Sequence, residues 1–96
     1  MLDARRDSLM KIVTVEFFYA GGCVHCANAR GALRETAESA GSVRWEEVNI
    51  ADNPSRAVDL GVVGTPAIAI DGRIAFQTAP SAAQLKAAIE ACLKDG

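Results

Sequence analysis

The chain has 96 residues, half of them apolar, and a formal net charge of −2. This length suits one domain with a single core and excludes a second domain. Basic residues are spread along the chain and form no stripe that could neutralise phosphates, which excludes nucleic acid as a partner. The longest uncharged apolar stretch, Val62 to Ile70, is too short to cross a bilayer, so we expect no membrane partner.

Residues 1–10 contain four charged side chains and no continuous apolar segment, unlike a secretory signal. We therefore expect a cytoplasmic protein. The regular apolar pattern begins only at Lys11, which predicts a disordered leader over 1–10 and a single domain over 11–96.

A strand and a helix are predicted first. Lys11 to Tyr19 is rich in Val, Ile and Phe, a pattern typical of a central strand covered on both faces. A helix follows from Cys23, and Gly41 ends it. Its apolar face has spacings of three and four, at Ala29, Leu33, Thr36, Ala37 and Ala40.

The middle of the chain predicts a second strand and a short helix. Val43 to Ile50 contains several charged residues, which indicates a strand at a sheet edge or one with a bulge. Asp52 or Asn53 can cap a helix that has Pro54 at its first position and ends at Gly61.

The last third predicts a hairpin and a helix. Two short apolar segments, 67–70 and 73–77, flank Asp71-Gly72, which is the strongest signal for a two-residue turn. Ser81 and Gln84 form a capping box at the start of a final helix. The predicted order is β-α-β-α-β-β-α with a four-stranded mixed sheet, an α/β fold class.

The most informative motif is Cys23-Val24-His25-Cys26, which lies between the first strand and its helix. If Cys23 opens the helix, the two Cα atoms lie about 5 Å apart, within the range that a disulfide needs. The helix start also favours the thiolate of Cys23, which is the nucleophilic form. The remaining cysteine, Cys92, shares a helix face with Leu85 and Ile89, so we interpret it as a core residue.

The element order, the C-x-x-C motif and Gly64-Thr65-Pro66 before the hairpin together resemble the thioredoxin-fold superfamily, especially its short thioredoxin and glutaredoxin-like members. The resemblance covers Lys11 to Lys94 and implies a three-layer fold. It also implies that Cys23 attacks, that Cys26 resolves the mixed disulfide, and that Pro66 has a cis peptide bond facing the dithiol. Thr65 would present its backbone to an extended substrate segment.

Two further residues bear on the site. A positive charge on His25 would stabilise the thiolate and make the protein more oxidising, although His25 could equally be a solvated residue. By the same resemblance, Glu16 could be a buried or half-buried carboxylate that takes the proton of Cys26, as a carboxylate on the equivalent strand does in relatives. We favour the interpretation of Glu16 as a solvated, edge-facing charge.

The sequence thus predicts a protein disulfide oxidoreductase without cofactor or bound metal, with roles in electron transport and cell redox homeostasis. Expected partners are substrate proteins with disulfides and an external reductase such as a thioredoxin reductase, and we expect a monomer. Gly22 replaces the Trp of common thioredoxins, and the glutathione-binding Gly-Gly-x-Asp of glutaredoxins is missing. The alternatives are a glutathione-driven glutaredoxin-like protein and a non-catalytic module that binds a metal or an iron–sulfur cluster through the same cysteines.

Overall fold

The computed structural model describes residues 12–95. The elements in chain order are β1 (Val13–Tyr19), α2 (Val24–Ser39), β2 (Val43–Asn49), α3 (Pro54–Leu60), β3 (Ala67–Ile70), β4 (Arg73–Phe76) and α4 (Ala82–Asp95). This order confirms the predicted fold class. The leader expected over residues 1–10 lies outside the described residues.

The four strands form one mixed sheet in the order β2-β1-β3-β4. β1 runs parallel to β2 and antiparallel to β3, so it is a central strand as predicted. β2 lies at an edge, where its charged side chains Arg44, Glu46 and Glu47 are exposed. The irregular register is between β3 and β4, at Ile68 and Ala69, and β2 pairs with β1 without a shift.

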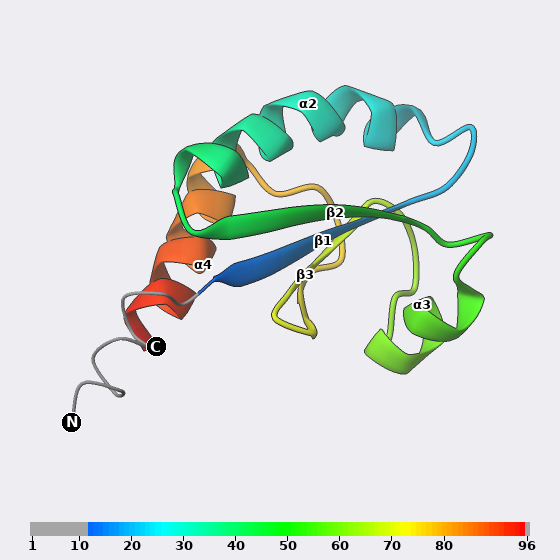
Figure 1. Ribbon diagram of the computed structural model, residues 1–96. Helices are drawn as coiled ribbons and strands as arrows, with labels where there is room; N and C mark the ends of the chain where they lie inside the picture. Colours follow the sequence, from blue (N-terminus) through cyan, green and yellow to red (C-terminus); the bar gives the residue numbers. More distant parts are fainter. Residues whose placement is uncertain (1–11, 96) are drawn as a thin grey trace.

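Helices cover the two faces of the sheet unequally (Figure 1). α2 and α4 pack on one face, where Val15 and Phe17 of β1 meet Leu33 of α2 and Ile89 of α4 in the larger core cluster. Alternate residues of β1 point to the opposite face, where Phe18 joins the alanines of β3 in a smaller cluster. The short α3 lies on this second face. Of the residues 54–60 that form it, all of which the structure describes, only Ala57 is buried.

Two local signals in the sequence are confirmed. Asp71 and Gly72 both have positive φ, 50° and 81°, which is the type I′ turn that such a hairpin needs. At the start of α4, the Gln84 N–H donates to Ser81 Oγ at 3.1 Å and the Ser81 N–H donates to Gln84 Oε1 at 2.9 Å. The capping box is therefore complete.

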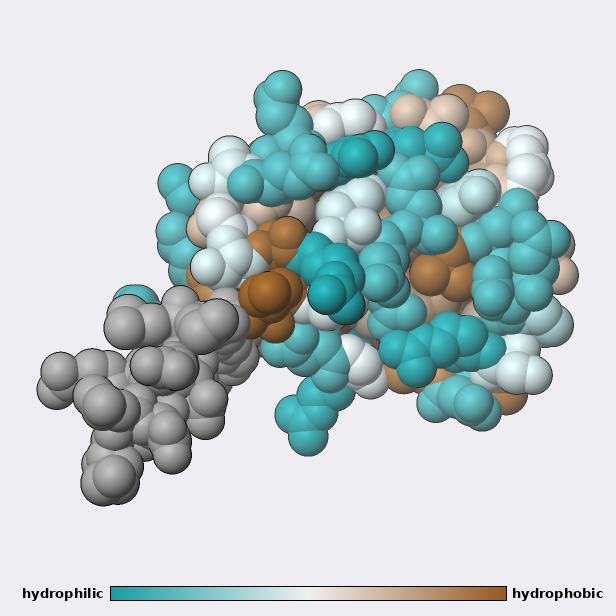
Figure 2. Space-filling view, in the orientation of Figure 1, coloured by the Kyte–Doolittle hydropathy of each residue, from teal (hydrophilic) through white to brown (hydrophobic). Residues whose placement is uncertain are grey.

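The surface is mainly hydrophilic on the face drawn in Figure 2, with apolar residues in small separate patches. Between residues 12 and 95, each helix is too short or too polar to span a bilayer.

Candidate active site

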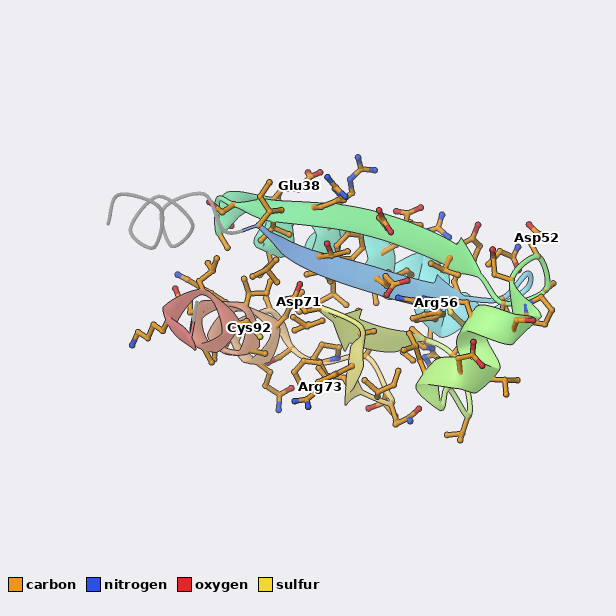
Figure 3. All side chains as sticks on the ribbon, turned by 60° about the horizontal axis from the view of Figure 1, so that its bottom comes forward. Glu38, Asp52, Arg56, Asp71, Arg73 and Cys92 are labelled. Carbon is orange, nitrogen blue, oxygen red and sulfur yellow. A yellow bond between two sulfur atoms is a disulfide. The ribbon has the colours of Figure 1, made fainter. Side chains whose placement is uncertain are left out.

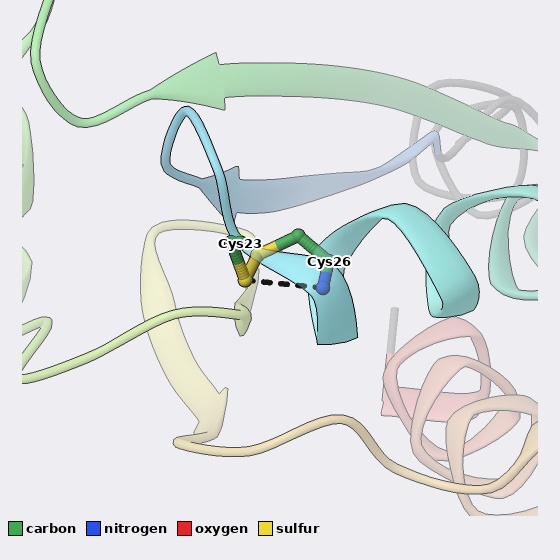
Figure 4. The surroundings of a disulfide bond; sticks show 2 residues. All are labelled: Cys23 and Cys26. Carbon is green, nitrogen blue, oxygen red and sulfur yellow. Dashed lines mark hydrogen bonds between the residues drawn. A yellow bond between two sulfur atoms is a disulfide. The ribbon is translucent and has the colours of Figure 1, made fainter.

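Cys23 and Cys26 are joined by a disulfide at the start of α2, with their Cα atoms 5.2 Å apart (Figure 4). This agrees with the separation expected from helical geometry. Cys23 is the N-cap, with extended backbone (φ −78°, ψ 104°), and Cys26 lies in the first turn. One turn of helix therefore places both cysteines at a separation that suits a disulfide.

Cys23 lies at the N-terminus of α2, the positive end of the helix dipole. Its Sγ accepts a hydrogen bond from the backbone N–H of Cys26 at 3.1 Å. The first turn of α2 contains no acidic side chain that would oppose a negative sulfur. An N–H donor and the positive end of the helix dipole both stabilise a thiolate at this position once the disulfide is reduced.

The loop before Cys23 explains the glycine found there. The N–H of Cys23 donates to the carbonyl of Ala20 at 3.2 Å, closing a tight turn. Gly22 has φ of +80° in this turn, in the left-handed region that favours glycine. A bulky residue such as Trp would be strained in this backbone. The conformation of the loop therefore explains why a glycine, and no large side chain, precedes Cys23.

The two sulfurs differ in burial. Cys26 is 1% exposed and belongs to the larger core cluster, whereas Cys23 is half-buried. Val24 and His25, the two residues between them, are both exposed, and Val24 keeps 67% of its surface in solvent. The motif therefore presents Cys23 and its neighbours outward and Cys26 inward.

A pocket of about 350 Å³ lies beside the motif, and its lining comes from three segments distant in sequence. These are His25, Thr65, Pro66, Thr78 and Ala79. The peptide bond between Thr65 and Pro66 is cis. The structure thus brings His25 together with Thr65 and Pro66. Sequence reasoning missed Thr78 and Ala79 because the loop between β4 and α4 has no motif of its own.

Glu16 corrects one expectation. The favoured interpretation, a solvated charge at a sheet edge, is wrong because Glu16 lies on a central strand and is 5% exposed. Arg56 of α3 forms two hydrogen bonds with its carboxylate, Nη2 to Oε1 at 2.7 Å and Nε to Oε2 at 3.0 Å. Figure 3 shows Arg56 between α3 and the sheet. Hydrogen bonding to Glu16, reinforced by its charge, raises the pKa of Arg56.

Glu16 also lies on the sheet face that carries Phe18, whereas Cys26 packs with Val15 and Phe17 on the other face. Its carboxylate is held by Arg56. The other interpretation of Glu16, that it takes the proton of Cys26, stays an untested hypothesis. Across residues 12–95, no group of three or more His, Cys, Asp or Glu side chains is placed to hold a metal ion.

A dithiol at the start of a helix on this four-stranded sheet defines the class of thiol-disulfide oxidoreductases with a thioredoxin fold. The family model described as Thioredoxin domain matches residues 12–90. The chain therefore belongs to the thioredoxin family and is a disulfide oxidoreductase.

Curated relatives support this assignment. The thioredoxin of Methanocaldococcus jannaschii is 34% identical over 82 residues, which cover 84% of this chain and 96% of the relative. A probable thioredoxin of Methanothermobacter thermautotrophicus is 32% identical over 79 residues, covering 81% and 93% of the two chains.

Solved structures support the fold. A mutant thioredoxin from Halobacterium salinarum NRC-1 superposes with a TM-score of 0.73 at 21% identity, covering 95% of this chain and 83% of that one. A structure of thioredoxin-2, described as a component of malaria parasite protein secretion machinery, gives a TM-score of 0.72 at 21% identity, with 83% and 82% coverage.

Proposed function

We propose that this protein exchanges its dithiol with disulfides of substrate proteins, with Cys23 as the attacking residue and Cys26 as the resolving residue. The difference in burial between the two sulfurs carries the assignment. A substrate disulfide must approach along the line of its S–S bond, so it can reach the half-buried Cys23 more readily than Cys26, which is 1% exposed. The helix N-terminus also favours the thiolate at Cys23.

The exchange takes two steps. The Cys23 thiolate attacks one sulfur of the substrate disulfide, so a mixed disulfide forms while the other substrate sulfur leaves as a thiolate. Cys26, after losing its proton, then attacks the Cys23 sulfur and releases the second substrate thiolate. Two electrons have passed to the substrate, and Cys23 and Cys26 are oxidised. The dithiol of an external reductase, such as a thioredoxin reductase, restores the reduced protein.

The pocket beside Cys23 is the proposed groove for a substrate segment. His25, Thr65 and Pro66 line it, and the exposed apolar side chains of Val24 and Val63 are sequence neighbours of these residues. We assign to Thr65 the role of pairing through its backbone with an extended substrate segment, a mode of recognition that leaves the substrate sequence nearly free. A positive charge on His25 would stabilise the Cys23 thiolate and make the protein more oxidising.

We also propose a cellular setting. The protein would act as a monomer in the cytoplasm, passing electrons between a reductase and oxidised proteins and so contributing to redox homeostasis. Turnover driven by a thioredoxin reductase, compared with turnover driven by glutathione and glutathione reductase, separates this role from the glutaredoxin-like alternative.

The experiment is a trapping comparison between Cys23→Ser and Cys26→Ser, each in a Cys92→Ala background so that the third thiol does not contribute. Cys26→Ser should accumulate long-lived mixed disulfides with a protein disulfide such as insulin, because the resolving thiol is missing. Cys23→Ser should trap almost none. Non-reducing electrophoresis measures both, and equal trapping by the two variants would show that the assignment of nucleophile is wrong.

A further inference from the structure

One glutamine side chain joins two loops that border the pocket. The Gln77 Nε2 donates to the carbonyl of Gly61 at 2.9 Å, and its Oε1 accepts from the N–H of Val63 at a longer 3.4 Å. The orientation of the amide is consistent, because its donor faces a carbonyl and its acceptor faces an N–H. Across the described residues, no other side-chain hydrogen bond links these two loops.

These contacts lie next to the two walls of the pocket. Gln77 directly precedes Thr78 and Ala79, which line one wall. Val63 lies two residues before Thr65, and Thr65 and Pro66 line the other wall. The amide of Gln77 therefore ties the two loops together near the points where both enter the pocket, in addition to the pairing of β3 with β4.

Apolar packing holds the loop from Gly61 to Thr65 at its start, where Val62 packs against the cluster around Phe18. Gly61 ends α3 in a left-handed conformation, and the N–H of Val62 donates to the carbonyl of Ala57, so the loop starts from α3. α3 itself buries only Ala57 among its residues, and Val63 is 85% exposed. Beyond Val62 the loop has little apolar burial, so polar contacts contribute to the positioning of its exposed part.

We propose that Gln77 is a positioning residue that sets the width of the substrate groove and thereby the affinity for protein disulfides. The inference rests on the proposed function, because it assigns to Gln77 an effect on binding to that same groove. Gln77 touches neither sulfur, so the intrinsic reactivity of the dithiol should not depend on it. Removal of the Gln77 hydrogen bonds should weaken the binding of protein substrates that occupy the groove. It should not change the rate with small disulfides.

The test compares Gln77→Met, which keeps the length of the side chain and removes both hydrogen bonds, with Gln84→Met as a matched control. Gln84 also bonds a backbone N–H through its amide, that of Ser81, and it contacts no residue of the 61–65 loop by a hydrogen bond. Gln77→Lys serves as a rescue variant because it retains a donor for the Gly61 carbonyl. Kinetics are measured with insulin as the protein disulfide and with dithiobis(nitrobenzoate) as the small disulfide.

Gln77→Met should raise the KM for insulin about threefold to tenfold, the range that corresponds to one net hydrogen bond, with kcat nearly unchanged. The rate with the small disulfide should stay at the wild-type value, Gln77→Lys should recover part of the KM, and Gln84→Met should leave it unchanged. Amide hydrogen exchange at Val63 should be faster in Gln77→Met. An unchanged KM for insulin, or an equal loss of kcat/KM with insulin and with the small disulfide, overturns the role of Gln77.

A wild-type protein that does not reduce insulin overturns the proposed function and the assignment of the pocket as a substrate groove.

Discussion

At the scale of single residues, the cysteines of one short motif acquire different chemistry from their positions on one helical turn. Cys23 caps α2 and its sulfur faces an N–H donor, whereas Cys26 packs in the core. Both positions follow from where the helix begins, and the apolar strand before the motif and the helical pattern after it indicated that start in the sequence. The spacing of the cysteines on a helix that begins at Cys23 predicted a Cα separation of about 5 Å, and the structure has 5.2 Å.

The placement of Cys23 gives a prediction for pH dependence. The helix N-terminus should lower the pKa of the Cys23 thiol in the folded, reduced protein below the unfolded value of about 8.5. An acid whose pKa is lowered by folding stabilises the fold fully above the unfolded pKa, and this contribution fades as the pH falls through the folded pKa. Reduced wild type should therefore gain stability relative to Cys23→Ala as the pH rises between those two values, measured by urea unfolding.

Substitution of His25 separates two sources of this effect. If a positive charge on His25 contributes, His25→Ala should raise the pKa of the Cys23 thiol and slow its alkylation at acidic pH, whereas the neighbouring exposed Val24→Ala should not. A purely dipolar origin predicts the same thiolate absorbance titration for both variants. A Cys23 that titrates at the ordinary value in every variant would contradict an activated thiolate.

At the scale of elements, the attachment of α3 to the sheet differs from that of the other helices. α2 and α4 pack through several buried apolar side chains. α3 buries one alanine, packs Leu60 partly against the cluster around Phe18 and reaches β1 through the Arg56–Glu16 ion pair. In this pair the Glu16 side chain is 6% exposed and the Arg56 side chain 47%. Removal of Arg56 would leave a buried carboxylate without its partner, which costs more than the loss of an exposed pair.

We therefore predict that Arg56→Met lowers the free energy of unfolding by about 1–3 kcal/mol, the cost of an unsatisfied buried group. The matched control is Arg34→Met, which breaks an exposed pair with Glu38 on α2 and a longer contact of 4.0 Å with Glu47 of β2 and should cost less than about 1 kcal/mol. Glu16→Leu combined with Arg56→Met should recover part of the loss, because no charge then remains buried. Urea unfolding measures all three, and equal costs for the two single variants would contradict this account.

At the scale of the whole molecule, the third cysteine is separated from the reactive pair by the arrangement of the helices. Cys92 is half-buried against the larger core cluster. It belongs to the C-terminal half of α4, which ends at the opposite end of the molecule from the first turn of α2 (Figure 1). Packing is therefore its expected role, in agreement with the face that it shares with Leu85 and Ile89.

Cys92→Ala should lower stability by about 1 kcal/mol, a typical cost of removing part of a packed side chain. Reduction of insulin should proceed at the wild-type rate, because the substitution leaves the dithiol and the pocket untouched. Thermal unfolding measures the change in stability, and the reductase assay measures the rate of insulin reduction. A folded variant that has lost turnover would assign Cys92 a role in the exchange.

The sequence by itself determined the features that depend on local chain geometry. These include the start of α2 at Cys23, the Asp71-Gly72 turn, the capping box at Ser81 and the order of the elements. Each arises from interactions between residues a few positions apart, so a motif of fixed spacing encodes it.

Only the tertiary structure decided the features that join distant segments. Glu16 was misread because its partner lies 40 residues away on α3, and no local pattern identifies that contact. The bond from Gln77 to Gly61 spans 16 residues, and Thr78 and Ala79 reach the pocket only because β4 pairs with β3. The sequence around a polar side chain does not show whether that side chain is solvated or paired in the fold. Its partner depends on the register of the sheet and on the packing of the helices.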